Sequence, residues 1–363
     1  MKPLQRVVTT PAGLASLGAH LQEQDAIGLD TEFLRERTYR PELCLVQLST
    51  SAQAACVDPL ALGDLSPLAP VLGNPRPVKV MHASRQDLEV LFPAFGLVRG
   101  VFDTQIAAAL TGLPPQIGYA DLVRRVLGRE LPKSHTRTDW SRRPLSPEQI
   151  EYALDDVRYL LPLKTHLEEQ LDRLGRLAWL EEELGELTDV RLATDPEEAW
   201  LRVKGLRSLD PDRTRLAREL AAWRERRAIE RNRPRGWIIE DAVLREIVLR
   251  VPRTMQALSA IPGIPAGLLK HCSEDILAIV HAARIPDPPP PPPSPRQRPD
   301  PEKQALVRKL SGVNQAIATD LGLSPEILAT RRDLEQLVEG RRELPILRGW
   351  RRGIVGERLL AAL

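Results

Sequence analysis

Two acidic residues, Asp30 and Glu32, stand two positions apart where the short apolar stretch 26–29 ends. In a β-strand, residues i and i+2 point to the same face, so the two carboxylates would lie side by side. Hard divalent cations such as Mg²⁺ and Mn²⁺ prefer oxygen ligands of this kind. A cation site is therefore one interpretation, and an exposed strand end whose acids face water is the other. The pair alone favours the exposed strand end, so further carboxylates must decide.

Three side chains from elsewhere in the chain can join that pair. Asp87 is expected in the first turn of a helix, where an acid also interacts well with the helix dipole. Tyr152 and Asp156 are four positions apart and would share one helix face, so the hydroxyl could orient a water beside a carboxylate ligand. Asp155 competes for the ligand role, and the spacing from Tyr152 favours Asp156. For each acid taken alone, a solvated position on an ordinary helix is the default interpretation.

The composition of the chain limits the classes of protein to which it can belong. Its 363 residues predict two or three domains, and the net charge of +2 makes no case for nucleic-acid binding by the whole surface. The three cysteines (Cys44, Cys56 and Cys272) are scattered, which predicts reduced, buried thiols and no zinc site. The first residues lack the apolar core of a signal peptide, and no apolar segment approaches transmembrane length. We expect a cytoplasmic location.

The apolar pattern changes in character along the chain. Before residue 190 the strand-like segments are 26–29, 43–48, 54–57 and 78–81, and the helix-like segments are 85–92, 104–110, 120–127 and 147–174. Strands that come first, with helices interleaved later, are typical of an α/β domain. After residue 195 we expect helices alone, at 213–231, 239–250, 254–260 and 265–283, and again within 301–363.

A proline-rich segment at residues 286–299 contains an unbroken proline run at 288–293. Proline lacks a backbone N–H and favours polyproline II, so a semi-rigid spacer is expected, with an SH3-type ligand as the sharper alternative. A softer boundary lies near Asp195-Pro196, which has the form of a helix start. We therefore expect domains at residues 1–190, 195–284 and 301–363, with a linker at 285–300.

The order and spacing of these residues resemble the three exonuclease motifs of the DEDD superfamily, in its tyrosine-containing branch. The matching segments are Asp30-Thr31-Glu32-Phe33, His82-Ala83 with Asp87-Leu88, and Tyr152 with Asp156-Val157. The segment from Lys133 through Arg137-Thr138-Asp139-Trp140 to Arg143-Pro144-Leu145 is similar to bacterial ribonuclease D. Residues 200–205, 220–224 and 236–239 resemble an HRDC domain, and 349–360 resemble a weaker second one. The proline run is not part of that family's pattern.

This resemblance implies a fold, an activity and a set of site residues. The implied fold is an α/β ribonuclease H-like exonuclease domain, a mixed sheet flanked by helices, followed by two small all-α HRDC-type domains. The implied metal ligands are Asp30, Glu32, Asp87 and Asp156, with Tyr152 orienting the attacking water. Two divalent ions, Mg²⁺ or Mn²⁺, would be the cofactors. The implied activity is 3′→5′ exoribonuclease release of 5′ mononucleotides, with 3′ maturation of tRNA precursors as its use and RNA as partner of a monomer.

A locally basic strip spans residues 124–143, where RNA phosphates could bind without sequence reading. Its candidate RNA contacts are Lys133, Arg137, Trp140 and Arg143. Trp140 could stack on a base, and a buried position that stabilises the loop is equally plausible. His82, beside a strand end, is expected to be structural rather than a ligand.

The first helical domain carries a second basic cluster within residues 224–235, which could also be an ordinary solvated helix face. Its tryptophans Trp200, Trp223 and Trp237 are expected to be buried core residues.

Two other functions remain open from the sequence. The same chemistry could act on DNA, because no residue visibly reads the 2′-hydroxyl that distinguishes RNA. A catalytically inactive nucleic-acid-binding scaffold is the alternative from another class. All four carboxylate positions are filled, which favours an active enzyme over such a scaffold.

Overall fold

The computed structural model describes residues 6–132, 138–189, 195–206, 209–286 and 300–363. Their contacts divide the chain into two compact units. The first unit contains residues up to Leu34, then 43–192, and the C-terminal residues from 298 onward. The second contains residues 35–42 and 193–297. In the described part of the chain, no helix is long and apolar enough to cross a membrane.

A six-stranded mixed sheet forms the centre of the first unit, in the order β1-β4-β3-β2-β5-β6. Its strands are β1 (Val7–Val8), β2 (Ala26–Leu34), β3 (Glu42–Ser49), β4 (Ala54–Val57), β5 (Val78–Met81) and β6 (Val101–Asp103). β1 pairs in parallel with β4, and β5 pairs in parallel with both β2 and β6, whereas β3 and β4 are antiparallel. The four predicted strands are present, and β2 continues beyond its predicted end at residue 29 to Leu34.

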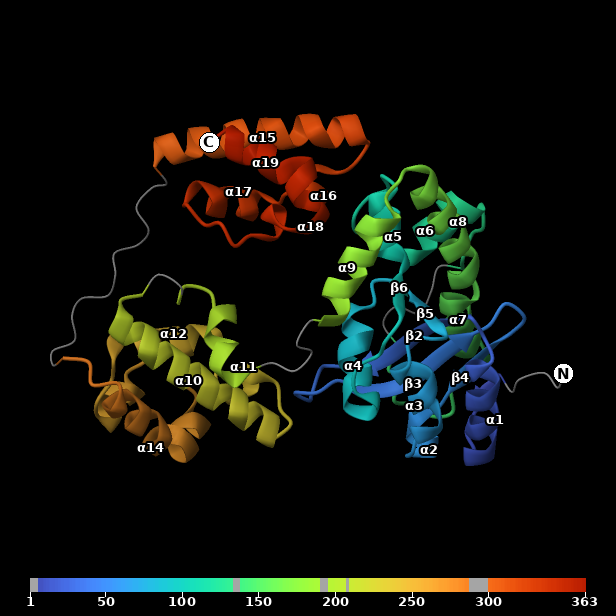
Figure 1. The fold of residues 1–363 in the computed structure, drawn as a ribbon. Coiled ribbons are helices and arrows are strands. Elements are labelled where there is room, and N and C mark those ends of the chain that lie inside the picture. The colour runs from blue at the N-terminus through green and yellow to red at the C-terminus, as the bar shows by residue number, and fades with distance from the viewer. Residues whose placement is uncertain (1–5, 133–137, 190–194, 207–208, 287–299) are drawn as a thin grey trace. The chain divides into compact units, whose positions relative to one another are not determined.

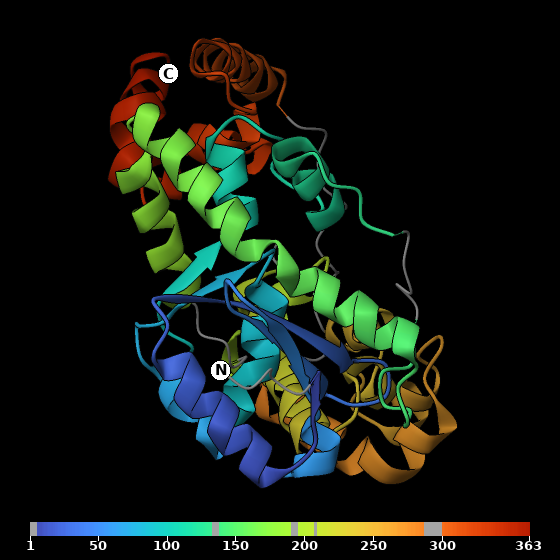
Figure 2. The same cartoon turned by 90° about the vertical axis from the view of Figure 1, so that its right-hand side faces the viewer.

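Helices cover both faces of this sheet. One face packs against α1 (Pro11–Gln22), α3 (Ala69–Gly73) and α4 (Arg85–Phe95) through a core that contains Leu29, Leu48 and Leu88. The other face packs against α5 (Thr104–Leu110), α6 (Tyr119–Leu127), α7 (Pro147–Arg158) and α8 (Leu160–Arg173). Figure 2 shows α7 and α8 as the green helices that run across the blue strands.

The prediction of one helix over residues 147–174 was wrong. The helix is interrupted at Tyr159, where φ is −105° and ψ is 2°, so α7 ends at Arg158 and α8 begins at Leu160. Pro162 explains the interruption, because proline has no N–H to donate to the carbonyl four residues earlier and its ring clashes with that carbonyl.

The C-terminal module packs against α9 (Leu177–Asp189) within the first unit. Its helices are α15 (Pro301–Leu321), α16 (Pro325–Leu328), α17 (Arg331–Val338), α18 (Gly349–Arg351) and α19 (Glu357–Ala361). The rings of Trp179 and Trp350 stack with centroids 4.3 Å apart, and the Trp350 indole N–H donates to Glu183 Oε1 at 2.8 Å. The all-helical character predicted for this segment is confirmed.

The second unit is built mainly from helices, of which Figure 1 labels α10, α11, α12 and α14. They are α10 (Pro211–Glu230), α11 (Arg235–Ile238), α12 (Asp241–Arg250), α13 (Met255–Ser259) and α14 (Ala266–Ala282). From residue 195 onward its described residues contain no strand, as predicted. Trp200 and Trp223 pack against its core, but Trp237 is 60% exposed, so the prediction that Trp237 is a core residue was wrong. Most of the proline-rich linker lies outside the described residues.

Candidate active site

The strand β2 presents its side chains alternately to the two faces of the sheet. Ile27 and Leu29 enter the core under α4, whereas Asp30 and Glu32 point to the opposite face, which α7 covers. Thr31 returns to the α4 side, where its hydroxyl donates a short hydrogen bond to Asp87 Oδ1. The strand therefore contributes the carboxylates of Asp30 and Glu32 to the site, and its Thr31 positions a third, that of Asp87, through this hydrogen bond.

The turn between β5 and α4 positions Asp87. Ala83 in this turn has a φ of 53°, which is unusual for a residue with a side chain. The carboxylate of Asp103 holds the turn, because it accepts hydrogen bonds from the Ala83 amide at 3.2 Å and from the Ser84 amide at 2.8 Å. Asp87 then lies in the first turn of α4 and is 7% exposed.

The helix α7 brings Tyr152 and Asp156 over the sheet. It begins at a capping box in which Ser146 and Gln149 exchange hydrogen bonds, with Pro147 in the first turn. The Tyr152 side chain hydrogen-bonds Asp156, which lowers the pKa of that carboxyl against the larger effect of burial. Asp155 instead pairs with Arg158. The structure thus separates the two neighbouring aspartates and turns Asp156 toward the other carboxylates.

Burial raises the pKa values of all four carboxylates, and the charges of the others add to this effect at Asp30 and Glu32. Burial is the largest cause for Asp30, and the charges of Asp87, Asp156 and Glu32 add to it, so its pKa lies well above the usual value. Burial and the charges of Asp156 and Asp87 raise the pKa of Glu32 to about 8. Burial also raises the pKa of Asp156 to about 7 and that of Asp87 to about 6. The side chains keep a small opening to solvent, but the surrounding protein excludes most bulk water.

No basic side chain in the described part of the chain neutralises this cluster. In the described ranges, none of the four carboxylates forms an ion pair with Lys, Arg or His. The donor set, four carboxylates and no soft ligand, fits hard divalent cations and excludes a zinc–thiolate site. Among the described residues, no three His, Cys, Asp or Glu side chains are arranged to hold an ion as they stand.

A pocket with an empty volume of about 270 Å³ opens beside the cluster, lined by Asp30, His82, Tyr119, Asp156 and Leu160. His82 Nδ1 lies 2.9 Å from Thr104 Oγ1 and Nε2 lies 3.0 Å from the Ile117 carbonyl, so both ring nitrogens are used internally. The Tyr119 hydroxyl donates to the Asp155 carbonyl at 3.0 Å. Tyr119 could not be predicted as a site residue, because nothing in its local sequence pattern links α6 to α7.

Known proteins resemble this chain over its whole length. A family model described as 3′-5′ exonuclease matches residues 5–172, and one described as HRDC domain matches residues 213–280. Ribonuclease D of Gluconacetobacter diazotrophicus is 39% identical over 361 residues, which covers 98% of this chain and 92% of that protein. Ribonuclease D of Nitrobacter hamburgensis is 38% identical over 360 residues, with coverages of 98% and 94%. The chain belongs to the ribonuclease D family.

The structural comparison agrees with this ribonuclease D assignment. The crystal structure of Escherichia coli RNase D, described as an exoribonuclease involved in structured RNA processing, matches with a TM-score of 0.88 at 32% identity. It covers 100% of this chain and 99% of that one. The expected fold class is confirmed, and this member of the ribonuclease D family is a 3′→5′ exoribonuclease whose substrate class is RNA.

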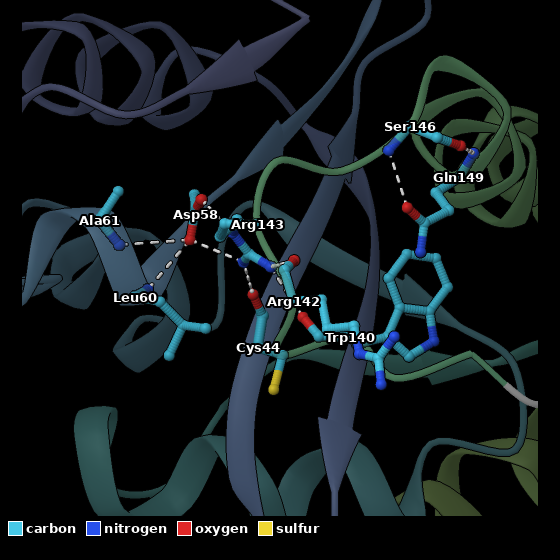
Figure 3. A network of polar contacts seen from close by, with 9 residues as sticks. All are labelled: Cys44, Asp58, Leu60, Ala61, Trp140, Arg142, Arg143, Ser146 and Gln149. Carbon is cyan, nitrogen blue, oxygen red and sulfur yellow. Dashed lines mark hydrogen bonds and ion pairs between the residues drawn. The ribbon is translucent and has the colours of Figure 1, made fainter.

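The candidate RNA contacts of this ribonuclease D family member fall into two groups. Lys133 and Arg137 lie outside the described residues. Arg143 donates to Asp58 at 2.6 and 2.8 Å and to the Cys44 carbonyl at 2.8 Å, as Figure 3 shows. Trp140 is 5% exposed and stacks on Tyr152, with ring centroids 6.0 Å apart. These contacts of Trp140 and Arg143 stabilise the loop, and a role for either residue in binding RNA stays a prediction.

Several arginines of the second basic cluster form ion pairs with acids of the second unit. Arg224, 3% exposed, donates to Asp241, and Arg227 donates to Asp275. Arg235 pairs with the fully buried Glu225. These pairs leave less unpaired positive charge in the segment 224–235 than its number of arginines implies.

Proposed function

We propose that this exoribonuclease removes nucleotides from the 3′ ends of structured RNA, with 3′-extended tRNA precursors as its substrate class, and depends on divalent cations held by Asp30, Glu32, Asp87 and Asp156. The observation that carries the proposal is a set of four carboxylates whose pKa values are raised and which, among the described residues, form no ion pair with a basic side chain. Its relative from Escherichia coli, described as acting in structured RNA processing, supports the substrate class.

The reaction is a hydrolysis. A water oxygen bonds to the phosphorus that joins the last two nucleotides. The bond from this phosphorus to the 3′ oxygen of the penultimate nucleotide breaks, and that oxygen takes a proton from the water. The products are a nucleoside 5′-monophosphate and an RNA shortened by one nucleotide with a free 3′-hydroxyl. Divalent cations bound to the carboxylates would supply the positive charge that activates the water and stabilises the departing 3′ oxygen.

Tyr152 has the position of a water-orienting group. Its hydroxyl already bonds Asp156, and its ring is fixed against the buried Trp140. A phenol keeps its proton at neutral pH, so Tyr152 acts through hydrogen bonding and not as a base. Replacing Tyr152 with Phe should lower kcat about 10- to 100-fold and leave KM for RNA nearly unchanged. An equal rise in KM would assign Tyr152 to substrate binding instead.

The decisive experiment digests a tRNA that carries extra 3′ nucleotides and sizes the products. We expect stepwise shortening from the 3′ end, release of 5′ mononucleotides and complete loss of activity with excess EDTA. A 3′-extended DNA of matched sequence, assayed in parallel, tests the choice of nucleic acid. Full activity in EDTA would exclude the cation-dependent mechanism, and equal degradation of DNA would exclude RNA specificity.

A further inference from the structure

Gln47 in β3 is a buried polar residue that the site described so far does not use. Its side chain is fully buried, and among the described residues neither its Nε2 nor its Oε1 has a hydrogen-bond partner. Ser49, two positions further on the same face of β3, donates to the Val157 carbonyl at 2.8 Å. The neighbouring polar side chain is therefore satisfied by α7, and the amide of Gln47 is not.

The sheet places Gln47 directly beside Asp30. β2 and β3 are neighbours, and the seven residues between Leu34 and Glu42 are too few for a parallel crossover, so the two strands run antiparallel. A Cβ added to Gly28 would meet Ser49 Oγ at 2.2 Å, so Gly28 and Ser49 face each other. Two positions along each strand, Asp30 and Gln47 face each other on the same side of the sheet.

The opposite neighbour of Gln47 also lies within the field of the carboxylates. Cys56 in β4 is the register partner of Gln47. Burial raises the pKa of the Cys56 thiol to about 12, and the charges of Asp156 and Glu32 add to this effect while Arg6 opposes it. The charges of the carboxylates are therefore felt at Cys56 in β4, and Gln47 lies between that strand and Asp30 in β2.

A buried amide with no partner is costly, and methionine would fill the same volume without that cost. Carboxylates that hold cations are in turn oriented by hydrogen bonds from surrounding groups. Directly opposed residues in a sheet have Cβ atoms about 4.5–5.5 Å apart, which lets a glutamine amide reach an aspartate carboxylate.

We infer that Gln47 is a positioning residue of the active site, whose Nε2, unpaired among the described residues, donates to the Asp30 carboxylate once cations are bound and holds it in orientation. The inference rests on the proposed function, because it assigns Asp30 as a cation ligand. Gln47 touches neither substrate nor cation and acts only through Asp30.

The test compares Gln47→Met and Gln47→Leu with a matched control, Leu48→Met, which changes a buried residue on the opposite face of the same strand. Mn²⁺ is titrated calorimetrically into each full-length, metal-free protein without RNA. Steady-state assays on 3′-extended RNA then separate kcat from KM. We expect both Gln47 variants to bind Mn²⁺ about 10-fold more weakly and to lose about 10-fold in kcat at unchanged KM. The control should match the wild type.

The melting temperature of the metal-free proteins completes the test. Both Gln47 variants should be at least as stable as the wild type, because they remove an unpaired amide. Greater stability with unchanged Mn²⁺ affinity and kcat would overturn the inference and leave the proposed function standing. A wild type that binds no Mn²⁺ and works in EDTA would instead overturn the proposed function, and this inference with it. Using two variants keeps the test valid if one of them fails to fold.

Discussion

Glu225 in the second unit is fully buried, yet Arg235 donates to both of its oxygens at 2.6 and 2.8 Å and the Tyr39 hydroxyl donates as well. Asp30 and Glu32 in the first unit are also largely buried, and no described residue gives either of them such a partner. Asp58, also in the first unit, follows the pattern of Glu225, because Arg143 pairs with it. The difference therefore lies between individual sites and not between the two folds.

This contrast separates acids that stabilise a fold from acids that are kept for chemistry. A carboxylate buried with a guanidinium is neutralised, and its hydrogen bonds fix the packing around it. Several carboxylates gathered without a cation destabilise one another, and such an arrangement is typical of functional sites. We propose that the four acids at β2, α4 and α7 belong to the second kind.

The largest expected effect comes from neutralising an acid of the unpaired cluster. Asp30→Asn should lower kcat by about 1,000-fold or more, because a cation ligand contributes several kcal/mol to transition-state stabilisation. The free energy of unfolding of the metal-free protein should stay equal or rise, since one repelling charge is lost. RNA digestion and urea unfolding measure the two quantities. Near-normal kcat, or a large loss of stability, would place Asp30 with the structural acids.

Glu225→Gln should have the opposite profile. Arg235 would lose its partner, and breaking a buried pair costs about 3 kcal/mol. Hydrogen exchange of α10 should become about 100-fold faster, which is that free energy expressed as a rate at about 1.4 kcal/mol per tenfold. Glu335→Gln is the matched control, because its pair with Arg331 is exposed (48% and 84%) and contributes less than about 0.5 kcal/mol.

The sequence revealed the two kinds of acid unequally. The i, i+2 spacing of Asp30 and Glu32 and the i, i+4 spacing of Tyr152 and Asp156 are local, so a strand or a helix alone places each pair on one face. The pairing of Arg143 with Asp58 spans 85 positions, and that of Tyr39 with Glu225 spans 186. No local pattern encodes such contacts.

The fold could be predicted to a similar degree. Apolar periodicity located the four longer strands, but β1 and β6 have only two and three residues and carry too little pattern. The interruption at Tyr159 was missed because the apolar stripe continues through it, and this stripe predicts one helix although Pro162 interrupts the backbone hydrogen bonds. The exposure of Trp237 depends on how α11 packs, which its composition does not determine. The position of Gln47 beside Asp30 could not be predicted, because it depends on the register between two strands.

Cation binding sharpens the contrast further, because only the unpaired cluster should respond to it. At a Mg²⁺ concentration about 100 times its dissociation constant, the wild type should gain about 2.7 kcal/mol of stability. Asp30→Asn should lose this gain, whereas Glu335→Gln should keep it, since Glu335 lies outside the cluster. Urea unfolding with and without Mg²⁺ measures the difference. An equal gain in Asp30→Asn would show that the ion binds elsewhere.

The smallest effect is expected at Asp58, where the pH dependence of the free energy of unfolding tests whether its charge stabilises the protein. Burial would raise the pKa of Asp58, but the hydrogen bonds and charge of Arg143, with the Ala61 and Leu60 amides, lower it below the usual value of 3.8. A carboxyl with a lowered folded-state pKa stabilises the protein above its unfolded value and loses that contribution as the pH falls through its folded value.

Asp58→Asn should therefore cost about 2 kcal/mol at neutral pH, since asparagine keeps the helix cap but not the charge on Arg143. The deficit relative to the wild type should shrink below about pH 4, where the wild-type carboxyl takes up a proton. Thermal unfolding of both proteins between pH 7 and pH 2.5 follows this difference. A deficit that stays constant across the range would mean that the contribution of Asp58 is packing and not charge, and the distinction between paired and unpaired acids would not extend to this residue.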